Sequence, residues 1–387
     1  MEEILKKKAV LILEDGSKFY GKSIGIQGIQ TGEIVFNTSM TGYQEVLTDP
    51  SYKDQIITFT YPHIGNVGVN INDEESSLIH IKGLIIREIS PISSNYRSTK
   101  SLIEYLKENK ILTIINIDTR KLTKKIRDTG SQKGCIICLN KIPKFKNYKD
   151  ILLYKNKNIK YKNKKKIYIW KEKSINIYSQ KKENYCTYYM KKKNIIAYDF
   201  GIKRNILRML KDRKCNLIVV PENTNFKDVL KLSPDGIFLS NGPGDPRIFT
   251  QAIQSIKKLI QYNIPIFGIC LGHQILALAN GAQIKKMKFG HHGSNHPVQN
   301  ISTKKIFITS QNHNFVIKKE NLPKQIKITY ISLFDNTIQG IEILNKPMFS
   351  FQGHPEACPG PNDSSFLFDQ FTKLVNKKKK YQRENNA

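Results

Sequence analysis

A cysteine flanked by glycines, in the segment Gly268-Ile-Cys-Leu-Gly272, is the strongest chemical signal in the sequence. The segment follows an apolar run and precedes a helix-like one, so we expect Cys270 at a strand-to-helix turn, as in a nucleophile elbow. Glycines permit a sharp turn there, and the first amides of the helix favour the thiolate, the form that attacks. On its own, such a pattern is equally typical of a small residue buried in a turn.

Two other segments carry residues that would complete acyl-transfer chemistry. In His354-Pro-Glu356 the histidine can carry a proton, and the carboxylate two residues later can orient its ring. In Asn241-Gly-Pro-Gly-Asp-Pro246 the glycines leave backbone amides open to an oxyanion. Alone, each signal is weak, because a surface His-x-Glu occurs by chance and a glycine-proline loop is usually an ordinary turn.

The elements around these segments predict how they are positioned. From residue 194 onward, apolar strand-like runs alternate with helical ones: strands at 195–198, 217–220, 236–240, 265–269 and 347–352, and helices at 203–211, 226–231, 251–262 and 272–280. Such alternation predicts an α/β domain with a mostly parallel central sheet. Ligands bind such sheets at the carboxyl ends of the strands, and all three chemical segments follow predicted strands.

The first 140 residues have a different pattern, which predicts a β-rich mixed domain. A hairpin is expected over 9–23, with strands at 33–36, 55–60, 83–89 and 111–117 and a helix at 101–109. We therefore divide the chain into an N-terminal domain (1–140), a Lys-rich connector (141–193) and an α/β domain (194–380). Trp170, in the connector, is expected to anchor it to a domain surface.

The formal net charge of +31 raises the possibility of a nucleic-acid partner. About half of the excess lies in the connector, which contains 18 lysines, no arginine and three acidic residues. Without arginine for base readout or a recognisable binding module, we expect no nucleic-acid partner and regard the charge as compositional. No apolar run approaches the roughly 20 residues that cross a bilayer, so no membrane association is expected.

The cysteines and histidines do not indicate a metal site. Six scattered cysteines are too few for a disulfide framework, which favours a reducing cytoplasm, and no signal peptide is recognisable after Met1. Cys135 and Cys138 lie in a strand-like apolar run and are interpreted as buried structural thiols. The histidines at 291, 292 and 296 lack partner ligands at metal spacing, so we predict no metal.

Taken together and in this order, three segments resemble the class I glutamine amidotransferases. They are Asn241-Gly-Pro-Gly-Asp-Pro246, Phe267-Gly-Ile-Cys-Leu-Gly-His-Gln274 and Phe351-Gln-Gly-His-Pro-Glu356. The resemblance implies that Cys270 is the nucleophile, that His354 is the base and that Glu356 orients it. It also implies that the amides of Gly242 and Leu271 hold the oxyanion.

Segments outside the α/β domain narrow the resemblance to the small subunits of carbamoyl-phosphate synthases. These segments are 35–52, 61–68, 117–123 and 288–293. The resemblance implies hydrolysis of glutamine through a cysteine thioester, and passage of ammonia to a large subunit that uses bicarbonate, ATP and Mg²⁺ to make carbamoyl phosphate. Whether this supplies pyrimidine synthesis, arginine synthesis or both stays open. It implies no cofactor in this chain, and it implies a glutamine site formed by Ser51, Gly242, Gly244, Leu271, Gln274, Asn312, Asn314 and Phe315.

One position departs from the family pattern, and two other functions stay open. Asn314 stands where the family usually has glycine; if the backbone there needs a positive φ, asparagine is the least costly substitute. A free-standing thiol hydrolase on the same fold is the main alternative, and a non-catalytic regulatory scaffold is another. The presence of Cys270, His354 and Glu356 argues against the scaffold, and the resemblance of the first domain argues against the hydrolase.

Overall fold

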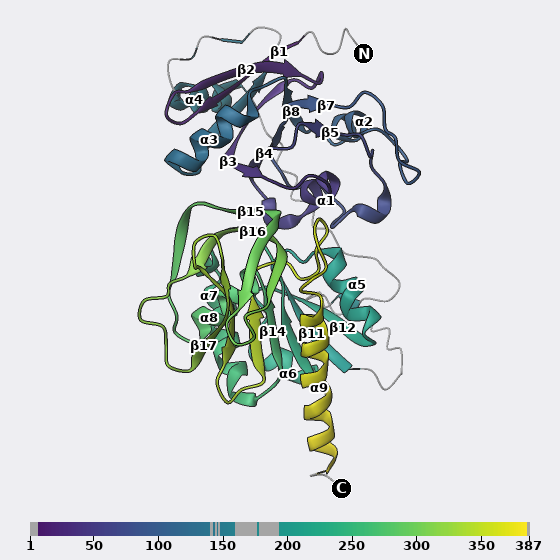
Figure 1. Cartoon of the computed structure of the whole chain (residues 1–387), viewed down its shortest axis with the longest axis vertical. Coiled ribbons are helices and arrows are strands. Elements are labelled where there is room, and N and C mark those ends of the chain that lie inside the picture. The colour runs from purple at the N-terminus through teal and green to yellow at the C-terminus, as the bar shows by residue number, and fades with distance from the viewer. Residues whose placement is uncertain are drawn as a thin grey trace. The chain divides into compact units, whose positions relative to one another are not determined.

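The computed structural model describes residues 7–139, 142–143, 145, 148–158, 176–177 and 193–384 (Figure 1). The chain divides into two compact units. Unit 1 comprises Met1–Ile167 and Lys288–Gly293, and unit 2 comprises Tyr168–Met287 and Ser294–Ala387. The inclusion of Lys288–Gly293 in unit 1 is a difference from the sequence-based division, which had one continuous second domain. Trp170 lies outside the described residues.

Unit 1 is built around a closed β-barrel, in the order β1-β2-β8-β6-β4-β3-β9. The barrel strands are β1 (Lys8–Leu13), β2 (Lys18–Ser23), β3 (Gly28–Asn37), β4 (Gln55–Phe59), β6 (Gly83–Ile85), β8 (Leu112–Ile115) and β9 (Gln132–Cys138). Strands β5 (His63–Ile64) and β7 (Glu88–Ile89) pair separately. The helices are α1 (Tyr43–Thr48), η2 (Pro50–Tyr52), η3 (Ile71–Asp73), α2 (Leu102–Glu108), α3 (Thr119–Thr129) and α4 (Tyr148–Asn158). The β-rich mixed character predicted for this part is confirmed.

Strand β1 is packed on both of its faces. Its residues are apolar on both faces, because Leu11 packs in one core cluster while Val10 packs in another with Tyr148 of α4. Covering both faces removes the alternation of polar residues that a half-exposed strand shows. The predicted hairpin is present, with β1 and β2 antiparallel. Helix α4 falls within the segment that the sequence analysis treated as a connector.

The predicted burial of the two closely spaced cysteines is confirmed. Cys135 and Cys138 lie on β9 with 0% and 2% of their surface exposed. Because they are three residues apart on a strand, they point to opposite faces, and they belong to different core clusters. Burial raises the pKa of the Cys138 thiol to about 11. The two residues are therefore separate core positions rather than a pair of neighbouring thiols.

Unit 2 contains an open sheet in the order β10-β12-β11-β13-β14-β19-β18-β17-β15-β16. Its strands are β10 (Asn176–Ile177), β11 (Lys193–Asp199), β12 (Cys215–Pro221), β13 (Gly236–Leu239), β14 (Ile266–Ile269), β15 (Ile284–Asn300), β16 (Ile306–Ile317), β17 (Ile326–Ser332), β18 (Ile338–Ile343) and β19 (Met348–Phe351). The pairings from β10 to β19 are parallel, and those from β19 through β18 and β17 to β15 are antiparallel. The α/β prediction is confirmed, with an antiparallel extension that the sequence did not indicate.

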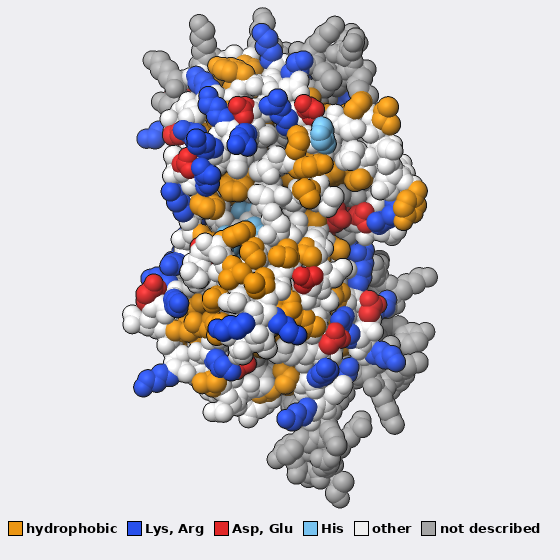
Figure 2. Space-filling model, in the orientation of Figure 1, with side chains coloured by type: hydrophobic (Ala, Val, Ile, Leu, Met, Phe, Trp, Pro, Cys, Tyr) orange, Lys and Arg blue, Asp and Glu red, His pale blue; other side chains and the backbone are white. Residues whose placement is uncertain are grey.

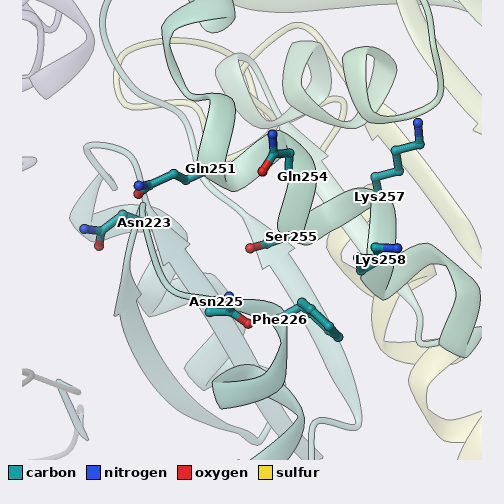
Figure 3. A pocket seen from close by; sticks show the side chains of 8 residues that line it. All are labelled: Asn223, Asn225, Phe226, Gln251, Gln254, Ser255, Lys257 and Lys258. Atoms are coloured by element: carbon teal, nitrogen blue, oxygen red, sulfur yellow. The ribbon is translucent and has the colours of Figure 1, made fainter.

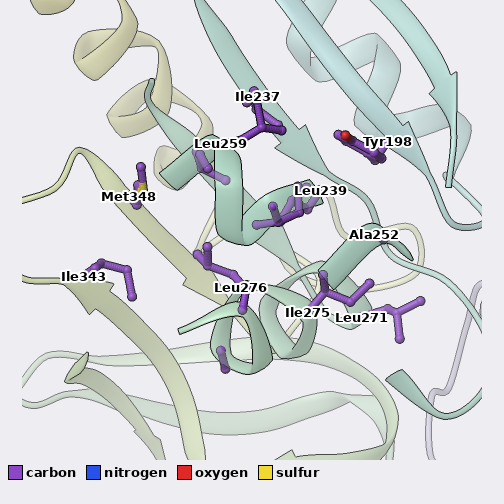
Figure 4. Packing of buried hydrophobic residues seen from close by; sticks show 14 of the residues in the cluster. Tyr198, Ile237, Leu239, Ala252, Leu259, Leu271, Ile275, Leu276, Ile343 and Met348 are labelled. Carbon is purple, nitrogen blue, oxygen red and sulfur yellow. The ribbon is translucent and has the colours of Figure 1, made fainter. Parts of the chain in front are cut away.

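Helices cover both faces of the parallel part of the sheet (Figure 1). They are α5 (Arg204–Asp212), α6 (Phe226–Lys231), η4 (Pro246–Ile248), α7 (Thr250–Leu259), η5 (Ile260–Tyr262), α8 (Leu271–Ala279) and α9 (Phe366–Glu384). One core cluster packs α7 and α8 on the sheet, and its members include Leu271, Ile275 and Leu276 of α8 and Leu239 of the sheet (Figure 4). The other cluster packs α5 and α9 on the opposite face. This double cover fixes α8, the helix that follows Cys270.

Figure 2 shows lysine and arginine side chains dispersed over the visible face among acidic, apolar and uncharged ones. Within the part of the chain that the structure describes, no helix is both long enough and apolar enough to span a membrane.

Candidate active site

Cys270 lies at the sharp turn between β14 and α8. Its backbone has φ 53° and ψ −104°, a left-handed region that is strained for a non-glycine residue. The turn is possible because Gly272 approaches β13 so closely that a Cβ there would lie 2.2 Å from the Leu239 carbonyl oxygen. The turn therefore has the geometry of the predicted nucleophile elbow, with the cysteine standing at the N-terminus of a nine-residue helix.

His354 and Glu356 follow β19, the strand that pairs in parallel with β14. The His354 backbone donates to the Ser310 carbonyl at 2.9 Å, which ties this loop to β16. His354 Nδ1 lies 2.6 Å from Glu356 Oε1, and the two residues are 1% and 0% exposed. His354 Nε2 is buried and has no hydrogen-bond partner among the described residues. Glu356 thus holds one ring nitrogen and leaves the other for chemistry.

Lys203, which the sequence analysis placed only in a helix, also belongs to this site. It follows β11, is 2% exposed, and its Nζ lies 3.1 Å from Glu356 Oε1. The same ammonium donates to the carbonyls of Ala357 at 2.6 Å and Cys358 at 2.9 Å. In the sequence, Lys203 is only the first residue of a predicted helix, which is too common a feature to identify a buried ion pair.

The charges in the site act on one another. Burial alone would raise the pKa of Glu356, but the positive charges of Lys203 and His354 outweigh burial, so the pKa of this carboxyl is lowered. Burial alone would lower the pKa of His354, but Glu356 and Cys270 outweigh it, so the pKa of the imidazole is raised. The site therefore favours a glutamate anion beside a histidine that can hold a proton.

The Cys270 sulfur and the two amides predicted to hold the oxyanion have the following surroundings. Its Sγ donates to the Asn312 carbonyl at 3.4 Å. Leu271 is the first residue of α8, so its amide cannot bond within the helix. Gly242 follows β13, and a Cβ there would lie 2.3 Å from the Phe200 carbonyl oxygen, so only glycine fits. Neither the Leu271 nor the Gly242 amide donates a hydrogen bond to another described residue.

The structure brings ten of the eleven predicted site residues together within unit 2. They are Gly242, Gly244, Cys270, Leu271, Gln274, Asn312, Asn314, Phe315, His354 and Glu356, all at the ends of adjacent strands or on β16 and α8. Gly244 has φ 91° and open space where a Cβ would be. Ser51 lies in unit 1, in the short helix η2, where its amide donates to Asp49 Oδ1 at 2.8 Å.

The premise for Asn314 is wrong. Asn314 lies inside β16 and is not among the residues with positive φ, so its backbone has an ordinary strand conformation. Asparagine therefore relieves no left-handed strain at this position, and replacing it with glycine would relieve none either. Any effect of Asn314, relative to glycine, on the binding of glutamine therefore comes from its side chain.

One cavity of unit 2 lies apart from the predicted site residues. This cavity, of about 580 Å³, lies between α6 and α7 and is lined by amide, hydroxyl and lysine side chains such as Asn223, Gln251 and Lys258 (Figure 3). It contains none of the predicted site residues. Among the described residues, no group of three or more His, Cys, Asp or Glu side chains is arranged to hold a metal ion.

Comparisons with known protein families agree with this architecture. The model of the family described as carbamoyl-phosphate synthase small chain, CPSase domain, matches residues 11–136, and that of glutamine amidotransferase class-I matches residues 196–374. A solved structure of a glutamine amidotransferase from Thermotoga maritima aligns with a TM-score of 0.37 at 18% identity, over 48% of this chain and 85% of that one.

The curated relatives match over nearly their whole length. A carbamoyl phosphate synthase small chain from Buchnera aphidicola subsp. Acyrthosiphon pisum is 57% identical over 97% of this chain and 98% of its own. Those from Pectobacterium atrosepticum and Escherichia coli K12 are 53% and 51% identical, over 95% and 97% of this chain and 97% and 99% of their own. The chain therefore belongs to the family of carbamoyl phosphate synthase small chains.

Proposed function

We propose that the chain is the glutamine-hydrolysing subunit of a carbamoyl phosphate synthase. The observation that carries this is the arrangement at the strand ends of unit 2, where a strained Cys270 stands at a helix N-terminus and His354 is held 2.6 Å from Glu356. A cysteine nucleophile with a histidine oriented by a carboxylate is the arrangement that splits an amide in two steps.

In the first step, the Cys270 thiolate attacks the side-chain carbonyl carbon of glutamine. The amides of Gly242 and Leu271, which have no other acceptor among the described residues, would hold the oxyanion. His354 then gives its proton to the departing nitrogen, so that ammonia leaves and a thioester remains. In the second step, His354 takes a proton from water, and the hydroxide releases glutamate and restores the thiolate.

We further propose that a separate large chain consumes the ammonia. The relatives are named small chains, which supports a partner, and the sequence contains no Walker A glycine loop or other recognisable nucleotide motif. ATP and Mg²⁺ would then bind the large chain, where bicarbonate, ammonia and ATP give carbamoyl phosphate. A reducing, ATP-containing cytoplasm is the proposed location, consistent with the unpaired thiols of Cys138, Cys215 and Cys270.

The test is to co-express the chain with the candidate large chain and assay the purified complex. We expect co-elution on a sizing column and carbamoyl phosphate formation from glutamine, bicarbonate and ATP, with faster glutamine hydrolysis in the complex than in the isolated chain. Hydrolysis at the same rate without co-elution would contradict the subunit proposal and favour the free-standing thiol hydrolase.

A further inference from the structure

The side chain of Gln274 has one fixed orientation. Gln274 lies on α8, one turn after Cys270, and its Nε2 is 2.7 Å from the Phe315 carbonyl oxygen and 3.0 Å from Gln352 Oε1. A backbone carbonyl can only accept, so the amide atom that faces Phe315 must be the NH₂ group. That group has two hydrogens, and both are used. The Oε1 of Gln274 is therefore held on the other side of the amide plane.

This oxygen is available to a ligand. Gln274 is 2% exposed overall. Its Oε1 accepts no hydrogen bond from any described residue, and this oxygen is not fully buried. The residue also stands beside the nucleophile, because its backbone amide donates to the Cys270 carbonyl at 3.2 Å. Gln274 and Cys270 contact the same strand, β16, at Phe315 and Asn312 respectively. The one side-chain polar atom that Gln274 still offers is thus an acceptor.

Gln352 supplies the second acceptor for the NH₂ group of Gln274, and one of its own polar groups is left unpaired. It follows β19, two residues before His354, and is 0% exposed. Its Oε1 must face Gln274, because the alternative would place two NH₂ groups against each other. Its own Nε2 then points away and is buried with no partner among the described residues. An unpaired buried donor is destabilising, a cost that a leucine of similar size would avoid.

We propose that Gln352 is a positioning residue for glutamine binding. Together with the Phe315 carbonyl, it holds the carboxamide of Gln274 so that the oxygen, and not the NH₂ group, faces the substrate. The substrate group that meets Gln274 is then a hydrogen-bond donor, and on glutamine the donor outside the reacting amide is the α-ammonium. This inference rests on the proposed function and adds a preference for substrates that carry that ammonium.

The test compares two substitutions at position 352 in the complex with the large chain. Gln352→Leu removes the second acceptor and leaves the Gln274 amide held by the Phe315 carbonyl alone, so its orientation is less tightly restrained. Gln352→Glu keeps an acceptor oxygen at the same place and loses only the NH₂ group that has no partner. We expect Gln352→Leu to raise the KM for glutamine about tenfold, the size of one charge-assisted hydrogen bond, with kcat changed much less. We expect Gln352→Glu to keep KM within about threefold of the wild type.

A second substrate separates positioning from general damage. The compound 4-carbamoylbutyrate is glutamine without the α-ammonium, so its hydrolysis should be unaffected by the orientation of Gln274. We expect Gln352→Leu to reduce the preference for glutamine over 4-carbamoylbutyrate about tenfold, whereas a merely loosened site would slow both substrates equally. Thermal unfolding of each variant checks folding, and Gln352→Met replaces the leucine variant if the latter does not fold.

Three results would overturn the inference: an unchanged KM in the leucine variant, an equal loss in the glutamate variant, or an unchanged preference between the two substrates. The proposed function is tested separately by the wild-type complex, which must hydrolyse glutamine. If the wild type hydrolyses glutamine and the leucine and glutamate variants do not differ from each other, the role of Gln352 is refuted and the proposed function still holds.

Discussion

The barrel of unit 1 and the open sheet of unit 2 place charged groups differently. In unit 1 the ion pairs that the structure describes, such as Lys82 with Asp54, lie at the surface. In unit 2 the lysine, histidine and glutamate of one cluster are each at most 2% exposed. Each of these residues follows a parallel strand, and the carboxyl ends of neighbouring parallel strands meet at one edge. An open parallel sheet can therefore gather buried charges, whereas these barrel strands serve packing.

The largest expected effect tests whether the chemistry belongs to the open sheet alone. Cys270→Ser should lower glutamine-dependent carbamoyl phosphate synthesis by at least about 10³-fold, because the hydroxyl is a far weaker nucleophile in this site. Ammonia-dependent synthesis by the complex should continue. The matched control is Cys135→Ala in the barrel wall, which should keep the glutamine-dependent rate. A serine variant that still hydrolyses glutamine near the wild-type rate would exclude Cys270 as the nucleophile.

The second prediction compares a buried ion pair with an exposed one. Lys203→Met leaves Glu356 buried without its lysine, so the free energy of unfolding should fall by about 3–5 kcal/mol and kcat should fall as His354 loses its orientation. Lys82→Met breaks a pair whose side chains are 41% and 62% exposed, and should cost less than about 1 kcal/mol. Urea unfolding of both variants measures the difference. Equal losses would mean that burial does not distinguish the two units.

The third prediction is a pH dependence. The raised pKa of His354 contributes stability that is complete below about 6.5 and is lost as pH rises toward about 10. The lowered pKa of Glu356 contributes stability that is complete above about 4.5 and is lost as pH falls toward about 2. The Tm difference between wild type and Glu356→Gln should therefore be largest between these limits and shrink on both sides. A difference that stays constant with pH would show that the two charges do not interact.

The smallest expected effect concerns the backbone of β16. Asn314→Gly should lower the free energy of unfolding by about 0.5–1 kcal/mol, the cost of glycine in a strand, with no gain in glutamine affinity from strain relief. The control is Asn336→Gly, at a residue with φ 56°, where the same substitution should cost nothing. A gain in stability at position 314 would mean that this backbone is strained after all.

The sequence predicted the α/β fold and the segments that approach one another, because strand-to-helix turns and glycine spacing are local signals. Cys270, His354 and Glu356 could be assigned to one site only through the order of their segments along the chain. The barrel closure and β15–β18 were missed because they depend on pairings between distant segments. Lys203 and Gln352 were missed as site residues because a hydrogen-bond partner far along the chain leaves no trace in local spacing. Asn314 was misjudged because strand conformation was not apparent from its neighbours.

Barrel closure also limits how another polypeptide can bind unit 1. An open sheet ends in a strand with unpaired backbone groups, onto which another polypeptide can add a strand of its own. The ring that runs from β1 to β9 and back has no such strand, because β9 pairs with β1. Main-chain addition and exchange of edge strands are therefore closed to this barrel. A polypeptide that binds the barrel must recognise its loops and outward-facing side chains, which are what differ from one protein to another.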